Sequence, residues 1–211
     1  MKNKKLIIFD FDGVIIDSYD HAYEGNTRTW PNLTHEQHKA IFNGNIYTEL
    51  NKIISPKYSS KEHHDWWLKE HAPKKKSLPI FKGMAETLRN LSKRYQLVIN
   101  TSSDQASTKE FLEINKANYF DAIYGVEISK DKIKRFKQIL SDYKISRKDC
   151  LFITDTAGDV RDAIGLSIPT LVVTWGYQNR GHFSQVEKQV IGFADKPSDI
   201  LKFLNPCASI K

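Results

Sequence analysis

Apolar residues along this chain occur in two patterns: short continuous runs, and positions three or four residues apart. The runs predict buried β-strands at residues 6–11, 97–99, 122–124, 151–153 and 170–173. The helical spacing predicts helices over residues 84–94, 105–115, 132–143, 159–166 and 197–204. Because strands and helices alternate, we expect an α/β protein with a doubly wound, mostly parallel sheet.

Residues 18–77 interrupt this alternation, because they contain no strand pattern. A capping box at Thr34–Gln37 predicts the start of one helix, and two more are expected over residues 46–54 and 60–70. Prolines on either side of Lys74, Lys75 and Lys76 predict a solvated linker at residues 72–79. We therefore predict a Rossmann-like α/β core domain formed by residues 1–17 and 78–211, with an inserted all-helical domain at residues 18–77.

Composition indicates a globular protein, since 27% of the 211 residues are charged and 40% are hydrophobic. No apolar run approaches the roughly 20 residues that span a bilayer. The run behind the basic N-terminus is also too short for a signal-peptide core. The two cysteines, Cys150 and Cys207, indicate no disulfide framework. We expect a cytoplasmic protein with no membrane partner.

The net charge is +7 and the isoelectric point about 9.2, which could indicate nucleic-acid binding. The lysines are spread along the chain instead of clustering, so we expect no nucleic-acid partner. A positive field would equally attract phosphorylated metabolites, and charge alone therefore does not decide the ligand.

Polar side chains follow the strands of the expected sheet. In a parallel sheet with right-handed crossovers, all the carboxyl ends of the strands lie at one edge. We expect that edge to gather the following residues: Asp10, Asp12, Thr101, Ser102, Asp155, Asp159, and either Lys130 or Lys132 from the start of a helix.

Carboxylates that lie close together repel one another and raise each other's pKa unless a cation lies among them. Hard oxygen ligands suit Mg²⁺. Thr101 and a lysine could then hold an anion beside the metal. A metal, an anion site and a free carboxylate together indicate phosphoryl transfer.

The same motifs resemble those of the haloacid dehalogenase-like hydrolase superfamily. Residues 9–18 match its first motif nearly in full, and residues 100–102 match the second. Residues 153–159 resemble the fourth, with Thr154 where a glycine is usual. Lys132 fits the third motif, and Lys130 is the alternative. Residues 174–177 and 194–201 are similar to the phosphoglycolate phosphatase-like branch, and the helical insertion resembles the type 1 cap of that branch.

The resemblance implies a role for each motif residue. Asp10 would be the nucleophile that forms an aspartyl-phosphate, and Asp12 the general acid and base. The phosphoryl group would be bound by Thr101, Ser102 and Lys132. Mg²⁺ would be held by Asp10, the backbone carbonyl of Asp12, Asp155 and Asp159.

The presence of Asp12 narrows the class of enzyme to phosphatases and phosphomutases. Dehalogenases of this superfamily lack that carboxylate, and phosphonatases replace it with a small residue. We expect a monomeric or weakly dimeric Mg²⁺-dependent phosphatase of a small phosphorylated metabolite. The alternatives are a sugar-phosphate mutase resembling β-phosphoglucomutase, and a catalytically silent binding protein. The sequence does not name the substrate.

Three further features have a structural interpretation as well as a functional one. Asp17 and Ser18 are expected to cap the first inserted helix, not to take part in catalysis. His63, His64 and His71 are expected to lie on a solvated face, since the run lacks interleaved partners for a metal. Residues 43–47 form either a turn between helices or a segment over the crevice, in which Gly44 and Asn45 would bind the substrate.

Overall fold

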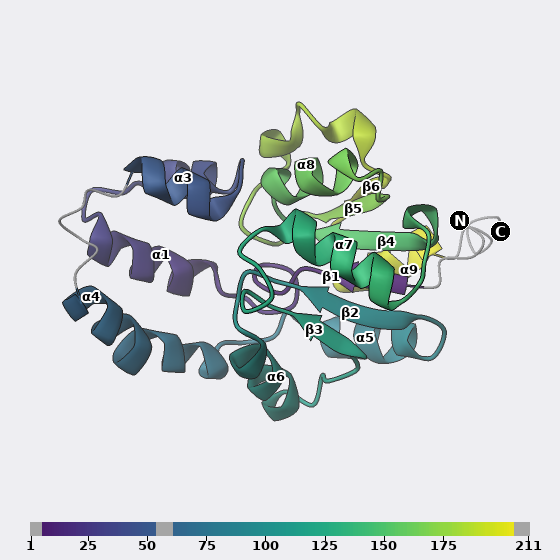
Figure 1. Cartoon of the computed structure of the whole chain (residues 1–211), viewed down its shortest axis with the longest axis horizontal. Coiled ribbons are helices and arrows are strands. Elements are labelled where there is room, and N and C mark those ends of the chain that lie inside the picture. The colour runs from purple at the N-terminus through teal and green to yellow at the C-terminus, as the bar shows by residue number, and fades with distance from the viewer. Residues whose placement is uncertain (1–5, 54–60, 205–211) are drawn as a thin grey trace.

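A computed structural model of the chain describes residues 6–53 and 61–204 (Figure 1). Six strands form one sheet in the order β3-β2-β1-β4-β5-β6, and every pairing is parallel. The strands are β1 (Leu6–Phe9), β2 (Gln96–Asn100), β3 (Ala122–Tyr124), β4 (Cys150–Thr154), β5 (Thr170–Val173) and β6 (Gly192–Ala194). The predicted α/β fold is confirmed. Strand β6 is not among the predicted strands, because three residues that begin with glycine form no recognisable apolar run.

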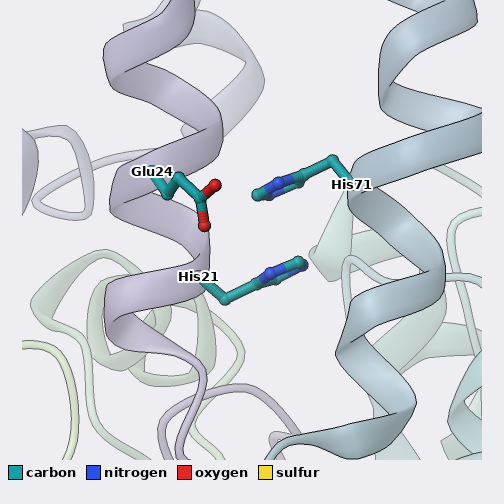
Figure 2. Close-up of side chains that lie close together, drawn as sticks. All are labelled: His21, Glu24 and His71. Atoms are coloured by element: carbon teal, nitrogen blue, oxygen red, sulfur yellow. The ribbon is translucent and has the colours of Figure 1, made fainter.

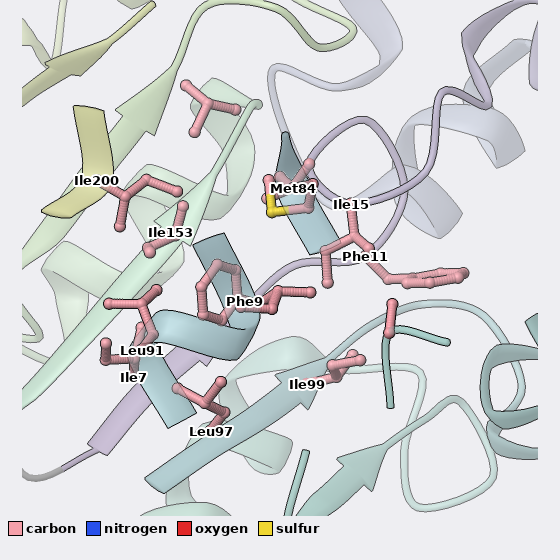
Figure 3. Close-up of a cluster of buried hydrophobic side chains, with 14 of the residues drawn as sticks. Ile7, Phe9, Phe11, Ile15, Met84, Leu91, Leu97, Ile99, Ile153 and Ile200 are labelled. Atoms are coloured by element: carbon pink, nitrogen blue, oxygen red, sulfur yellow. The ribbon is translucent and has the colours of Figure 1, made fainter. Parts of the chain in front are cut away.

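Five helices cover the two faces of the sheet, and the alternation of side chains along β1 shows how. Ile7 and Phe9 belong to one buried cluster, shown in Figure 3, which packs against helices α5 (Met84–Ser92), α6 (Gln105–Ile114) and α9 (Ile200–Leu204). Leu6 and Ile8 point to the other face, against α7 (Lys132–Asp142) and α8 (Ala157–Gly165). Because both faces are covered, all of β1 is buried, as expected for a central parallel strand.

The segment between β1 and α5 contains helices and turns in its described part. These are α1 (Tyr19–Thr29), α2 (His35–Ile41), α3 (Ile46–Ile53), α4 (Lys61–Trp66), a π-helical turn η2 (Trp67–His71) and a 3₁₀ helix η3 (Ala72–Ser77). Figure 1 shows α1, α3 and α4 to one side of the sheet. We call residues 18–77 the cap; their division from the core as a separate domain stays a prediction. None of the described helices is long and apolar enough to cross a membrane.

A local sequence signal begins helix α2 of the cap, and backbone hydrogen bonds pair the two connections between the cap and the core. Thr34 and Gln37 form the predicted capping box, with each side chain bonded to the backbone N–H of the other residue. The two connections to the core run side by side, because Asp17 N–H donates to the Pro79 carbonyl (3.0 Å) and Phe81 N–H donates to the Ile15 carbonyl (3.0 Å).

A buried histidine in α2 predicts a loss of stability in acid. His38 is fully buried, and burial lowers its pKa to about 4. Between pH 6.5 and 4 the unfolded chain binds a proton that the folded chain does not, so the free energy of unfolding should fall as the pH decreases. At pH 5 this residue is expected to cost about 2 kcal/mol relative to pH 7.

Denaturant unfolding of the parent protein and His38→Gln at pH 7 and pH 5 measures this effect. The variant should lose less stability between the two values than the parent does. His35→Gln, which changes an exposed residue of the same helix, is the control and should keep most of the loss, because burial is the larger cause of the lowered pKa of His38. An identical loss in the parent and His38→Gln would contradict the prediction.

Candidate active site

The polar strand ends meet where the strand order reverses direction. β1 lies between β2 and β4, so Asp10 follows a strand whose two neighbours are followed directly by Thr101 and Asp155. In open α/β sheets the crevice at this switch point is the usual ligand site. The topology thus explains why residues from four distant parts of the sequence come together here.

A buried cluster at this point consists of Lys132 and three aspartates, Asp10, Asp155 and Asp159. Lys132 Nζ lies 3.0 Å from Asp10 Oδ2 and 2.6 Å from Asp159 Oδ2. Asp10 Oδ1 accepts a hydrogen bond from the Phe11 N–H (2.8 Å). The structure therefore places Lys132 in the cluster at the start of α7, whereas Lys130 is exposed.

The charges of this cluster do not balance. Burial raises the pKa of Asp10 well above its usual range, against the effect of Lys132 and with a further contribution from Asp159. Burial likewise raises the pKa of Asp155 to about 7. Burial also opposes ionisation of Asp159, but Lys132 and the hydrogen bonds to this carboxyl together outweigh burial and lower its pKa. Three carboxyl groups around one ammonium thus leave a site that favours a further cation.

Asp155 provides a direct test of whether a metal fits. Its Oδ2 accepts a hydrogen bond from the Tyr177 N–H (2.7 Å), while its buried Oδ1 has no hydrogen-bond partner among the described residues. Gly13, with φ of +73°, turns the chain tightly against this carboxylate, and a Cβ there would overlap Asp155 Oδ2. A buried carboxylate oxygen that lacks a donor, beside two other carboxylates, fits a hard divalent cation.

Asp12 lies outside this cluster and has donors of its own. Its carboxylate accepts hydrogen bonds from Ser18 Oγ (2.7 Å), Ser103 Oγ (2.7 Å) and Lys75 Nζ (2.8 Å). Burial opposes ionisation of Asp12, but the Lys75 ammonium and these hydrogen bonds together lower its pKa. Two carboxylates, two residues apart, therefore have opposite protonation behaviour: Asp12 favours the ionised form, which suits a base, whereas Asp10 favours the neutral form and would be ionised, as a nucleophile must be, when a cation lies beside it.

Sequence reasoning gave two of the three donors to Asp12 another role and missed the third. Ser18 is the N-cap residue of α1, as predicted, but its side chain bonds Asp12 and makes no capping hydrogen bond. The solvated-linker prediction is wrong for Lys75, whose side chain is only 16% exposed, whereas Lys74 and Lys76 are 58% and 50% exposed. No local pattern distinguishes Lys75 from its neighbours. Ser103 directly follows the second motif, which was the available signal.

Thr101 and Ser102 occupy the turn after β2. Thr101 is buried, and its Oγ1 accepts a hydrogen bond from the Ser103 N–H (3.0 Å). Ser102 lies beside the buried Arg135, which also donates from Nε to Asn100 Oδ1 (2.7 Å). This arginine, one turn after Lys132 on α7, fixes the end of β2 relative to the start of that helix. The roles of Thr101 and Ser102 in binding a phosphoryl group stay predictions.

The segment between α2 and α3 contacts the fourth motif. The Gly158 N–H donates to the Phe42 carbonyl (2.9 Å), and the side chain of Arg161 donates to the Asn43 carbonyl. Gly44 lies against Gly158, whereas the Asn45 side chain accepts from the Thr48 N–H (3.3 Å) at the start of α3. The segment is thus a turn between helices that also rests on α8. Whether Gly44 and Asn45 bind substrate stays a prediction.

Two glycines of α8 allow this contact to be tested. A Cβ on Gly158 would lie 2.5 Å from the Gly44 carbonyl oxygen and 2.8 Å from that of Phe42, so Gly158→Ala should push the segment away from α8. A Cβ on Gly165 meets nothing within 4 Å, so Gly165→Ala should stabilise the helix by about 0.5–1 kcal/mol. Thermal unfolding of both variants should therefore shift in opposite directions. Equal shifts would show that the contact between the cap and α8 is absent in solution.

The chain is similar to proteins of one known family. A family model described as haloacid dehalogenase-like hydrolase matches residues 7–173. A haloacid dehalogenase-like family hydrolase from Streptococcus pneumoniae superposes with a TM-score of 0.81 at 21% identity, covering 97% of this chain and 100% of that chain. A search of curated proteins found no match.

Two further solved structures have the same architecture. One is a predicted phosphoglycolate phosphatase from Haemophilus somnus, with a TM-score of 0.74, 19% identity and coverage of 97% of this chain and 99% of that chain. The other, described as a β-phosphoglucomutase from Thermotoga maritima, has a TM-score of 0.69, 21% identity and coverage of 96% and 99%. At these identities the likeness is one of fold.

Proposed function

Because the chain belongs to the haloacid dehalogenase-like hydrolase family, we propose that it is a phosphatase that hydrolyses a small phosphorylated metabolite. The predicted family membership is confirmed, whereas the reaction is our inference. The observation that carries it is the separation of Asp10, which contacts Lys132 in a buried cluster, from Asp12, which has its own donors. A phosphoryl group bound between them would meet a nucleophile on one side and a proton donor on the other.

The reaction proceeds in two displacements. An oxygen of Asp10 forms a bond to phosphorus as the bond to the leaving alcohol breaks. Asp12, which must have bound a proton before this step although its pKa is lowered in the free protein, gives that proton to the alcohol. Asp12 then takes a proton from water, whose oxygen attacks the aspartyl-phosphate and releases inorganic phosphate. Lys132 and Thr101 hold the phosphoryl oxygens while negative charge moves across them.

Asp10, Asp155, Asp159 and the backbone carbonyl of Asp12 would hold Mg²⁺. Asp155 Oδ1, which is buried and has no hydrogen-bond partner among the described residues, supports this assignment, because a cation would be a partner for that oxygen. When bound, the metal offsets the repulsion between an anionic phosphate and the carboxylates around it. We propose that the protein acts in the cytoplasm as a monomer or weak dimer, on metabolites and not on nucleic acid or membranes.

A sugar-phosphate mutase is the second candidate. The observation that favours it is the close seating of the cap, since Lys75 bonds Asp12 and Phe42 bonds α8. A mutase must keep water away from its phosphorylated aspartate while a bisphosphate turns over in the site. Activity that depends on an added sugar bisphosphate would distinguish a mutase from a phosphatase.

Release of inorganic phosphate from a panel of phosphorylated metabolites tests the proposal. We expect release from at least one compound in Mg²⁺ and its loss when a chelator removes the metal. Conversion between sugar phosphates, only with a bisphosphate present, would replace the phosphatase assignment by the mutase. No reaction from folded, Mg²⁺-bound protein would overturn both and leave a silent binding protein.

A further inference from the structure

Three potential metal ligands lie together in the cap, and none of them belongs to the acidic cluster that Asp10, Asp155 and Asp159 form around Lys132. His21 and Glu24 are one turn apart on α1, and His71 ends the π-helical turn η2 (Figure 2). One ligand atom from each residue lies within 4.8 Å of the other two. His71 is buried against α1, so its interpretation as part of a solvated face is wrong; the side chains of His63 and His64 lie outside the described part of the chain.

The backbone on both sides allows this close approach. α4 passes into a π-helical turn at Trp67–His71, a wide turn that often marks a functional site. On α1 the neighbouring residue is Gly25, where a Cβ would lie only 2.7 Å from His71 Nε2. A side chain at that position would push the imidazole away from α1. The glycine and the wide turn together bring His71 to His21 and Glu24.

His21 is in the form that binds metals. Burial, together with the nearby His71 and Lys75, lowers the pKa of His21 to about 4. At neutral pH its imidazole is therefore uncharged, and no proton has to leave before a metal binds. Glu24 adds a negative charge at the exposed side, where Lys74 Nζ lies 3.6 Å from its carboxylate.

We propose that His21, Glu24 and His71 form a binding site for a transition-metal dication such as Zn²⁺. Two imidazoles and one carboxylate form a ligand set that Zn²⁺ accepts, with water in the fourth position. Mg²⁺ prefers oxygen ligands and belongs to the acidic cluster, so the two sites select different metals.

Binding requires a local rearrangement that the geometry defines. The imidazoles of His21 and His71 are stacked, with ring centroids 3.9 Å apart and planes within 1° of parallel. A metal lies in the plane of the ring that binds it, so one ion cannot lie in both planes while the rings are stacked. One ring must turn about its Cβ–Cγ bond. The bound ion then ties α1 to η2, four residues before Lys75.

Titration with Zn²⁺ against a chromophoric chelator, in excess Mg²⁺, tests the proposal. The parent protein should bind one Zn²⁺, and Asp155→Asn should bind it equally, because the acidic cluster is not involved. Glu24→Gln should weaken binding by at least about tenfold, and His71→Asn should weaken it more. His38→Asn removes another buried imidazole of the cap and should leave the affinity unchanged.

Co²⁺ provides a readout that is independent of affinity and of catalysis. A tetrahedral site with nitrogen ligands should give a visible absorption band in the parent protein, and His71→Asn should lack that band. The Glu24 side chain is 59% exposed, so Glu24→Gln is expected to fold whether or not the histidine variant does. Equal Zn²⁺ affinity in the parent and Glu24→Gln, or loss of Zn²⁺ binding only in Asp155→Asn, would overturn the proposal.

Discussion

Asp10→Asn is expected to lower the turnover of any substrate by at least about 10⁴-fold. An amide oxygen is a far weaker nucleophile than a carboxylate, and the substitution keeps the size and shape of the side chain. The hydrogen bond from the Phe11 N–H can persist, and Lys132 retains Asp159 as a partner. The loss should therefore be chemical and not structural.

The stability of the same variant separates these two explanations. The folded-state pKa of Asp10 is raised, so in metal-free protein ionisation of this group destabilises the fold as the pH rises above the unfolded value. Removing the charge should leave the free energy of unfolding at pH 7 unchanged or higher. Denaturant unfolding with a chelator present, together with phosphate release in Mg²⁺, measures both properties.

Asp162→Asn is the matched control for this experiment. Asp162 is a half-buried carboxyl on α8, where burial raises its pKa to about 6, but no described contact joins it to Asp10. Its variant should keep turnover within a few-fold of the parent protein. Comparable turnover in Asp10→Asn and the parent would show that another group attacks phosphorus.

The second large effect is expected at the cap, from Lys75→Met. Lys75 is the cation that lowers the pKa of Asp12 against the effect of burial. Without it, Asp12 should bind a proton more tightly and serve less well as the base that activates water. We expect turnover near neutral pH to fall about 10²-fold, which is at the lower end of what a general base contributes.

The pH profile shows whether Lys75 acts through Asp12. Stronger proton binding moves the acidic limb of the kcat profile to higher pH, so part of the lost activity should return as the pH rises. A merely structural role would lower kcat equally at every pH. Lys74→Met and Lys76→Met remove the same charge from exposed neighbours and should leave the profile unchanged. An unshifted profile in Lys75→Met would contradict the assignment.

The sequence alone determined the core and half of the site. Continuous apolar runs at β1, β2 and β4 can be buried only on both faces of a parallel sheet, and right-handed crossovers then bring their carboxyl ends to one edge. Asp10 and Asp155 follow such runs directly, so their meeting follows from chain connectivity. Lys132 was one of two lysines at the start of a helix, and only the structure chose it over Lys130.

The tertiary structure decided how the cap meets the core. Lys75 reaches Asp12 across 63 residues of sequence, and His71 stacks on His21 from a different helix. These contacts depend on the packing angle of one helix against another and on single rotamers. Neither leaves a periodic signal along the chain, because a lysine in a polar run and a histidine in a helix look the same whether they face water or a partner.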